Sequence, residues 1–178
     1  MRQTAEQRAC RRIEADGKKW TFILFSATAL ALWRHWGKRR DAIRNLLELS
    51  LQVWVECAED KDKSMVRICE DETGIEIYNG DGASWHDVCF LNGEDPGMMT
   101  DAQWLYMRQQ QIKWVRPQLM ACLMTALHRK YGFGYERCSR IYQQIQEIEA
   151  EYGSDPKRIR QVCRDETGIN VTDVMAKR

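Results

Sequence analysis

The chain has 178 residues, of which 44% are hydrophobic and 30% are charged, so it is long enough to bury a real core and is neither disordered nor fibrous in composition. Lys and Arg number 27 against 26 Asp and Glu, so the net charge of +1 excludes no partner by itself. The apolar run at residues 20–33 is shorter than the roughly 20 residues that a bilayer-spanning helix needs. We therefore expect a buried core helix there and no membrane contact.

The first half of the chain predicts four helices. The first runs from Thr4 to about Ala15 and ends before Gly17, and the second runs from about residue 18 to Trp36 and is closed by Gly37. The third and fourth have apolar residues at helical spacing and the fourth ends at Gly74. Those apolar positions are Ile43, Leu46, Leu47, Val53 and Cys57, followed by Met65, Ile68 and Cys69.

The next segment, 78–99, has a different character. It is acidic and contains turn sequences at both ends, with a partly alternating stretch at 85–91. We expect an irregular or β-like insert.

The rest of the chain repeats the first half. Cys69-Glu-Asp-Glu-Thr-Gly-Ile-Glu-Ile77 returns as Cys163-Arg-Asp-Glu-Thr-Gly-Ile-Asn-Val171, and Gly37 returns as Gly132. Ser154-Asp155-Pro156 is a strong helix start before the second copy of this motif. We predict one all-α domain, internally duplicated with about four helices per copy and pseudo-twofold symmetry. Its parts are helical copy 1 at 1–77, the insert at 78–99 and helical copy 2 at 100–178, and the third helices are expected to form the shared core.

Catalytic and cofactor motifs do not appear in the sequence. None of the three histidines stands at zinc spacing, and there is no phosphate loop and no hydrolase nucleophile motif. The seven cysteines include no C-x-x-C pair, and the first residues lack the apolar stretch of a signal peptide. We expect a cytoplasmic protein with buried, reduced thiols, no cofactor, no metal and no enzymatic activity.

Carboxylates end both copies of the repeated motif. Glu70, Asp71 and Glu72, like Asp165 and Glu166, fall in the last turn of a predicted helix, where the helix dipole disfavours negative charge. An arginine from a neighbouring helix would offset this cost, so a structural salt bridge is the first interpretation. A partner contact and a metal site are the alternatives.

Charge is segregated along the chain, with net values of +6 for residues 1–55, −9 for 56–95 and +4 for 96–178. Two basic clusters flank the Gly37 and Gly132 turns and are candidates for contact with nucleic acid or ribonucleoprotein, with Trp33, Trp36, Tyr131, Phe133 and Tyr135 available to stack on bases. The alternative is a solvated turn with its aromatic residues packed inward. The clusters contain Arg34, Lys38, Arg39, Arg40, Arg44, Arg129, Lys130, Arg137 and Arg140.

The acidic segment is a second candidate surface, because it can imitate phosphate on a basic partner. A solvated surface is the alternative. The residues concerned are Glu70, Asp71, Glu72, Asp81, Asp87, Glu94 and Asp95.

The stretch from Trp20 to Gly37 resembles a family of small proteins carried by bacterial phages and prophages, as do residues 106–111 and 126–137. Some members of this family are type II-A anti-CRISPR proteins. The resemblance implies a Cas9 inhibitor that binds the Cas9–guide RNA complex in the host cytoplasm and blocks target DNA recognition or cleavage by occupancy. These stretches are not a functional motif, so no residue role is carried over.

Two other functions fit the sequence. One is a phage DNA-binding or transcription-regulating protein, which would show steep salt dependence on DNA without Cas9. The other is a phage structural or assembly protein, which would self-associate. A homodimer is possible in any of the three cases.

Overall fold

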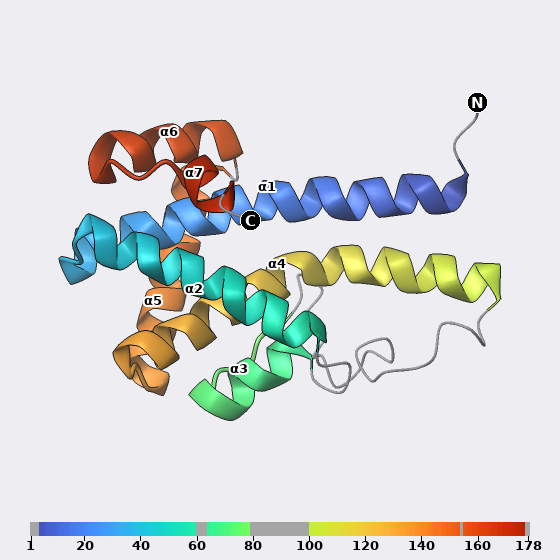
Figure 1. Ribbon diagram of the computed structural model, residues 1–178, viewed down its shortest axis with the longest axis horizontal. Helices are drawn as coiled ribbons and strands as arrows, with labels where there is room; N and C mark the ends of the chain where they lie inside the picture. Colours follow the sequence, from blue (N-terminus) through green and yellow to red (C-terminus); the bar gives the residue numbers. More distant parts are fainter. Residues whose placement is uncertain (1–3, 60–63, 79–99, 154, 177–178) are drawn as a thin grey trace.

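The computed structural model describes residues 4–59, 64–78, 100–153 and 155–176, and every regular element in these ranges is a helix. The all-α prediction is confirmed (Figure 1). The first half forms α1 (Ala5–Trp36), α2 (Arg40–Glu59) and α3 (Met65–Thr73). The second half forms α4 (Asp101–Tyr131), α5 (Tyr135–Glu151), α6 (Pro156–Thr167) and the short α7 (Val171–Met175).

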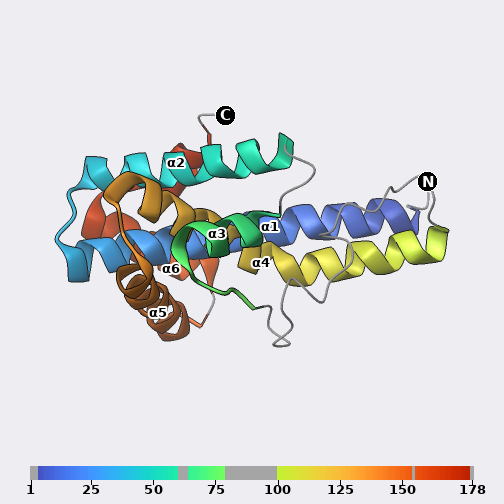
Figure 2. The ribbon, with the colours of Figure 1, turned by 90° about the horizontal axis from the view of Figure 1, so that it is seen from below.

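The centre of the molecule is the pair of long helices α1 and α4, which contact each other and run in the same direction (Figures 1 and 2). The apolar run within α1 is a core segment, since residues 23–32 are all buried. The facing part of α4 is likewise buried from Leu119 to Leu127. The expectation that the third helices form the shared core is wrong, because α1 and α4 occupy that position.

In each half the first two predicted helices form one long helix, and the second half ends in a short helix, α7, that was not predicted. The expected break before Gly17 does not occur, and α1 is one helix of 32 residues. Glycine inside a helix costs only about 1 kcal/mol, and apolar contacts on both sides of it, at Ile13 and Trp20, outweigh that cost. In the same way α4 continues through Pro117, which is buried between Val115 and Leu119.

The helix ends agree with the sequence signals. Thr4 and Gln7 form a capping box, and the Asp155 carboxylate accepts hydrogen bonds from the amides of Lys157 and Arg158, with Pro156 next in the chain. Gly37 closes α1 in the left-handed conformation with φ of 56°.

The two halves are interleaved rather than side by side. Helix α6 packs on α1 and α3 packs on α4, so each short helix lies on the long helix of the other half. Helix α5 packs on α1 and α2 on α4 in the same crossed manner. Residues 1–77 and 100–178 therefore share one core. The duplication itself stays a prediction from the sequence.

The β-like character expected at 78–99 falls outside the described residues, apart from the exposed Tyr78. Among the helices that are described, none combines the length and the hydrophobicity needed to cross a bilayer.

Candidate nucleic-acid interface

The turns at Gly37 and Gly132 meet at one end of the molecule, opposite the N-terminal ends of α1 and α4 (Figure 1). Three rings join them, and we call these rings, of Trp36, Tyr131 and Phe133, the aromatic cluster. The centroid of the Phe133 ring lies 5.1 Å from that of Trp36 and 5.4 Å from that of Tyr131. These tilted contacts bring together the two turns that the predicted basic clusters flank.

Hydrogen bonds from the two halves hold the aromatic cluster in place. The Tyr131 hydroxyl donates to the carbonyl of Ala42 at 3.0 Å, and the Trp36 indole donates to the Gln144 side chain at 2.8 Å. Both bonds run between the halves, so neither turn can shift alone. Burial raises the pKa of Tyr131, and its hydroxyl therefore stays protonated as a donor at neutral pH.

Cationic side chains cover the faces of these rings. Lys38 Nζ lies 4.4 Å from the Tyr131 centroid, and the guanidinium of Arg137 lies 5.5 Å from that of Phe133. Arg140 lies 6.0 Å from the Trp36 centroid, at the outer limit of a cation–π contact. The ring faces are thus covered by cations, so phosphate is better placed than a base to bind this surface.

Two predicted aromatic residues lie outside the aromatic cluster. Trp33 is 41% exposed and Tyr135 is 61% exposed, so both leave ring surface in solvent. The Tyr135 ring has one edge near Gly74, where a Cβ added to the glycine would lie 3.6 Å from the ring.

Two of the nine predicted cations have structural partners. Arg34 donates two hydrogen bonds to Glu166, at 2.9 and 2.6 Å, and Arg129 donates two to Glu72, at 3.0 and 2.7 Å. Both pairs connect a long helix to the short helix of the other half. The first interpretation of the helix-end carboxylates, a salt bridge from a neighbouring helix, is confirmed for Glu72 and Glu166.

Electrostatics reinforces these crossed pairs. The hydrogen bonds to Glu166 raise the pKa of Arg34, and those to Glu72 raise the pKa of Arg129. Arg34 also contacts Glu151 at 3.4 Å and the Tyr152 hydroxyl at 3.1 Å. Because carboxylates already neutralise the charges of Arg34 and Arg129, these two arginines are poor candidates for phosphate contact.

The remaining seven cations form none of the salt bridges found among the described residues. We call them the basic end. Two exposed carboxylates, Asp41 and Glu136, lie among these cations, in the first turns of α2 and α5. Seven positive charges against two negative ones leave the basic end with a net positive charge. The basic end consists of Lys38, Arg39, Arg40, Arg44, Lys130, Arg137 and Arg140.

The basic end is not repeated between the halves. Arg34 and Arg129 are equivalent in the sequence repeat, but Lys38, Arg39 and Arg40 correspond to Phe133, Gly134 and Tyr135. The shared arginine is the one that holds the halves together, and Arg39 and Arg40, which have no basic equivalent, are exposed.

The structure disperses the predicted acidic surface. Glu72 is paired with Arg129, whereas Asp71 is exposed and pairs with Arg67 at 3.9 Å. Glu70 is half-buried and also interacts with a neighbouring group. The other four predicted residues, Asp81, Asp87, Glu94 and Asp95, lie outside the described residues.

Sequence patterns did not reveal one buried ion pair. The Glu149 carboxylate accepts three hydrogen bonds from Arg116, at 3.2, 3.3 and 2.7 Å, and the guanidinium carbon lies 5.7 Å from the Trp20 centroid. These residues are 33 apart in the chain and match no motif. The only sequence signal is a charge at Glu149 on the face of α5 that otherwise carries Ile141, Ile145 and Ile148.

The buried thiols are poor nucleophiles. Burial raises the pKa of Cys69 and of Cys163 to about 11 and that of Cys138 to about 12. Within the ranges described, no three His, Cys, Asp or Glu side chains come together as metal ligands would.

Comparison of the chain with protein-family models, with curated protein sequences and with solved structures finds no match. The function is therefore inferred from the geometry of the chain itself.

Proposed function

We propose that this protein acts by occupancy, binding the sugar–phosphate backbone of a nucleic acid with its basic end. The observation that supports this most is that the two turns, which carry these seven cations on and beside them, meet at the aromatic cluster, with Lys38, Arg137 and Arg140 over its rings. Each contact with a phosphate releases a counterion, so such a surface binds nucleic acid without needing to read its sequence. The covered ring faces favour backbone contact over base stacking.

The salt dependence of binding tests this proposal. We would measure fluorescence anisotropy of a labelled DNA duplex between about 50 and 200 mM salt, because log K falls by about 0.9 per phosphate neutralised. The variant Arg39→Gln/Arg44→Gln/Arg137→Gln removes three cations that hold no described carboxylate. We expect at least tenfold weaker binding and a salt slope reduced by about 3.

A matched variant controls for net charge. Arg8, Arg11 and Arg12 are exposed near the start of α1, at the end of the molecule opposite the basic end (Figure 1). Arg8→Gln/Arg11→Gln/Arg12→Gln also removes three cations and should leave binding nearly unchanged. Equal losses in both triple variants, or no binding by the unchanged protein at low salt, would contradict the proposal.

A second candidate function follows from the resemblance to anti-CRISPR proteins, namely inhibition of Cas9 in the bacterial cytoplasm. The basic end supports it in one respect, because it could contact the guide RNA of the loaded complex. The test is size-exclusion chromatography with guide-loaded and guide-free Cas9, followed by a DNA-cleavage assay.

We expect co-elution with the loaded complex, loss of cleavage, and recovery of cleavage in the Arg39/Arg44/Arg137 variant. Binding to duplex DNA with no co-elution would instead support a phage DNA-binding protein. Light scattering on the free protein, run in the same experiment, reports whether it is a homodimer.

A further inference from the structure

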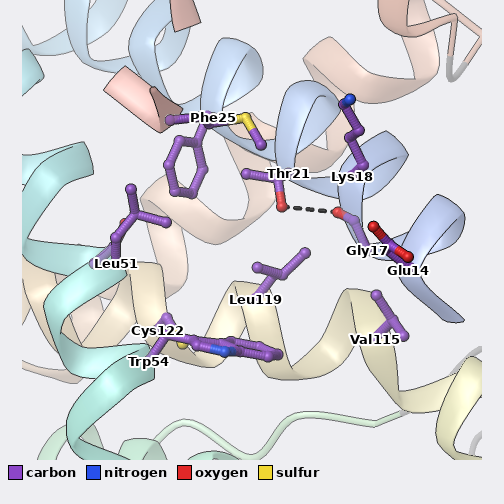
Figure 3. Close-up of a pocket in the computed structure, with 12 residues that line it drawn as sticks. Glu14, Gly17, Lys18, Thr21, Phe25, Leu51, Trp54, Val115, Leu119 and Cys122 are labelled. Carbon is purple, nitrogen blue, oxygen red and sulfur yellow. Dashed lines mark hydrogen bonds between the residues drawn. The ribbon is translucent and has the colours of Figure 1, made fainter. Parts of the chain in front are cut away.

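A cavity of about 310 Å³ opens between α1, α2, α4 and α7 (Figure 3). It begins near Gly17, about 28 Å along α1 from Trp36, so it is separate from the basic end. Residues from all four helices line it. They are Glu14, Gly17, Lys18, Thr21 and Phe25, then Ser50, Leu51 and Trp54, then Val115, Leu119 and Cys122, and Met175.

The wall of the cavity is apolar and aromatic. Figure 3 shows Phe25, Leu51, Trp54 and Leu119 around its open centre. Its two hydroxyl groups are used within their own helices. Thr21 donates to the carbonyl of Gly17 at 2.7 Å and Ser50 donates to that of Leu47 at 2.7 Å. A ligand here would meet mostly hydrocarbon surface, and the two hydroxyl groups, whose protons are already donated, could only accept a hydrogen bond from it.

The cavity is open on the side that Gly17 lines. A Cβ built on Gly17 would meet no atom within 4 Å, although glycine is among the least favourable residues for a helix interior. Its backbone needs no special conformation, since only Gly37, Gly74, Gly132, Gly153 and Gly168 have positive φ among the described glycines. The backbone conformation therefore does not require a glycine at this position, and the open space beside Gly17 belongs to the cavity.

The charges at the mouth cancel. Glu14 and Lys18 are both exposed and lie one helical turn apart on α1, with opposite charge. A charged ligand head group would gain from one of them and be repelled by the other, which favours a neutral ligand.

We propose that this cavity binds a small neutral hydrocarbon-like molecule. A cavity of about 150 Å³ holds one benzene ring, so this one accommodates roughly ten carbons, as a fused aromatic pair or a short alkyl chain. The site is independent of the basic end and adds a ligand to the proposed function.

The test uses n-decanol as the probe on the full chain, with isothermal titration calorimetry and the shift in Tm measured by circular dichroism. Gly17→Leu places a side chain in the open space without a clash at Cβ, and Gly17→Ala is its matched control. We expect decanol to bind the unchanged protein and Gly17→Ala and to raise the Tm of both. Binding to Gly17→Leu should be at least tenfold weaker, with an unchanged helical spectrum.

Decanoate and Lys18→Gln test the neutral character of the ligand. Decanol should bind Lys18→Gln as it binds the unchanged protein. Tighter binding of decanoate than of decanol, lost in Lys18→Gln, would overturn the assignment to a neutral ligand. No binding of decanol to the unchanged protein, or equal binding to Gly17→Leu, would overturn the site itself.

Discussion

Arg34 donates two hydrogen bonds to Glu166 and Arg116 donates three to Glu149, and the two glutamates differ in burial. The Arg34 and Glu166 side chains are 26% and 37% exposed, whereas those of Arg116 and Glu149 are 23% and 11% exposed. Losing one partner costs more where the other charge is left away from water. The burial of the carboxylate therefore sets the cost of losing its arginine.

We accordingly expect Arg116→Ala to lower the free energy of unfolding by about 3 kcal/mol, because it leaves the buried Glu149 carboxylate without its partner, and Arg34→Ala by about 1 kcal/mol. Urea unfolding followed by circular dichroism measures both values. The variants Arg116→Met and Arg34→Met keep much of the side-chain packing and so separate loss of charge from loss of packing. Equal costs for the two positions would show that burial does not control these pairs.

The Arg34–Glu166 pair also predicts a pH dependence. The hydrogen bonds from Arg34 hold the pKa of Glu166 below its ordinary value of 4.5. A depressed native pKa stabilises the fold above the ordinary value, and this stabilisation is lost as the pH falls through the native value. The stability difference between the unchanged protein and Arg34→Ala should therefore shrink from neutral pH to about pH 3. A constant difference across that range would contradict the role given to this pair.

At the scale of the helices, the C-terminal caps were the most predictable feature. Gly74 and Gly168 end α3 and α6 with φ of 73° and 70°, as the repeated Thr-Gly-Ile sequence indicated. The hydroxyl of Thr73 accepts a hydrogen bond from the amide of Ile75 at 3.1 Å, and that of Thr167 does the same for Ile169. These are local interactions, and local sequence is enough to predict them.

Alanine at these caps should destabilise the fold. We expect Gly74→Ala and Gly168→Ala each to cost about 1 kcal/mol, because a Cβ is disfavoured at positive φ. Gly168→Ala should cost slightly more, since its Cβ would lie 3.4 Å from the Arg40 guanidinium. Gly17→Ala is the opposite case and should stabilise α1 by about 0.5–1 kcal/mol. Thermal unfolding of the three variants gives the ranking, and a stabilising Gly74→Ala would contradict it.

The continuity of α1 could not be predicted from local sequence. Gly17 is a weak stop signal, and what carries the helix past it is packing between Trp20 and Arg116 of α4, almost a hundred residues away. The candidate site likewise has features that local sequence predicts and features that only the fold reveals. Its cations were visible as clusters, but only the fold separates Arg34, which is bound to Glu166, from Arg39, which faces solvent.

For the whole molecule, the crossed packing means that neither half has a complete interior alone. Helix α3 covers α4 and helix α6 covers α1, so separating the halves would expose both long helices. The sequence repeat predicted two equivalent units, but it could not show which unit each short helix packs on. That choice depends on contacts made across the whole chain.

Cleavage between the halves tests this arrangement. We expect a protease site inserted within residues 79–99 to yield, after cleavage, two fragments that elute together in native size-exclusion chromatography. Unfolding of the cleaved protein should remain a single transition, because the halves share one core. A cleaved chain whose halves elute separately as folded species would show that each half is an independent domain.

The five-residue motif Asp-Glu-Thr-Gly-Ile occurs twice, and each copy ends a helix and supplies a glutamate to an arginine of the other half. Glu72 and Glu166, one in each copy of the motif, form the ion pairs that bind the two halves to each other. Substitution is restricted at both glutamates, since replacing either one leaves an arginine of the opposite half without its partner. The turns at Gly37 and Gly132 are not restricted in this way. One of them carries Lys38, Arg39 and Arg40 while the other carries Phe133, Gly134 and Tyr135, so the two turns present different surfaces.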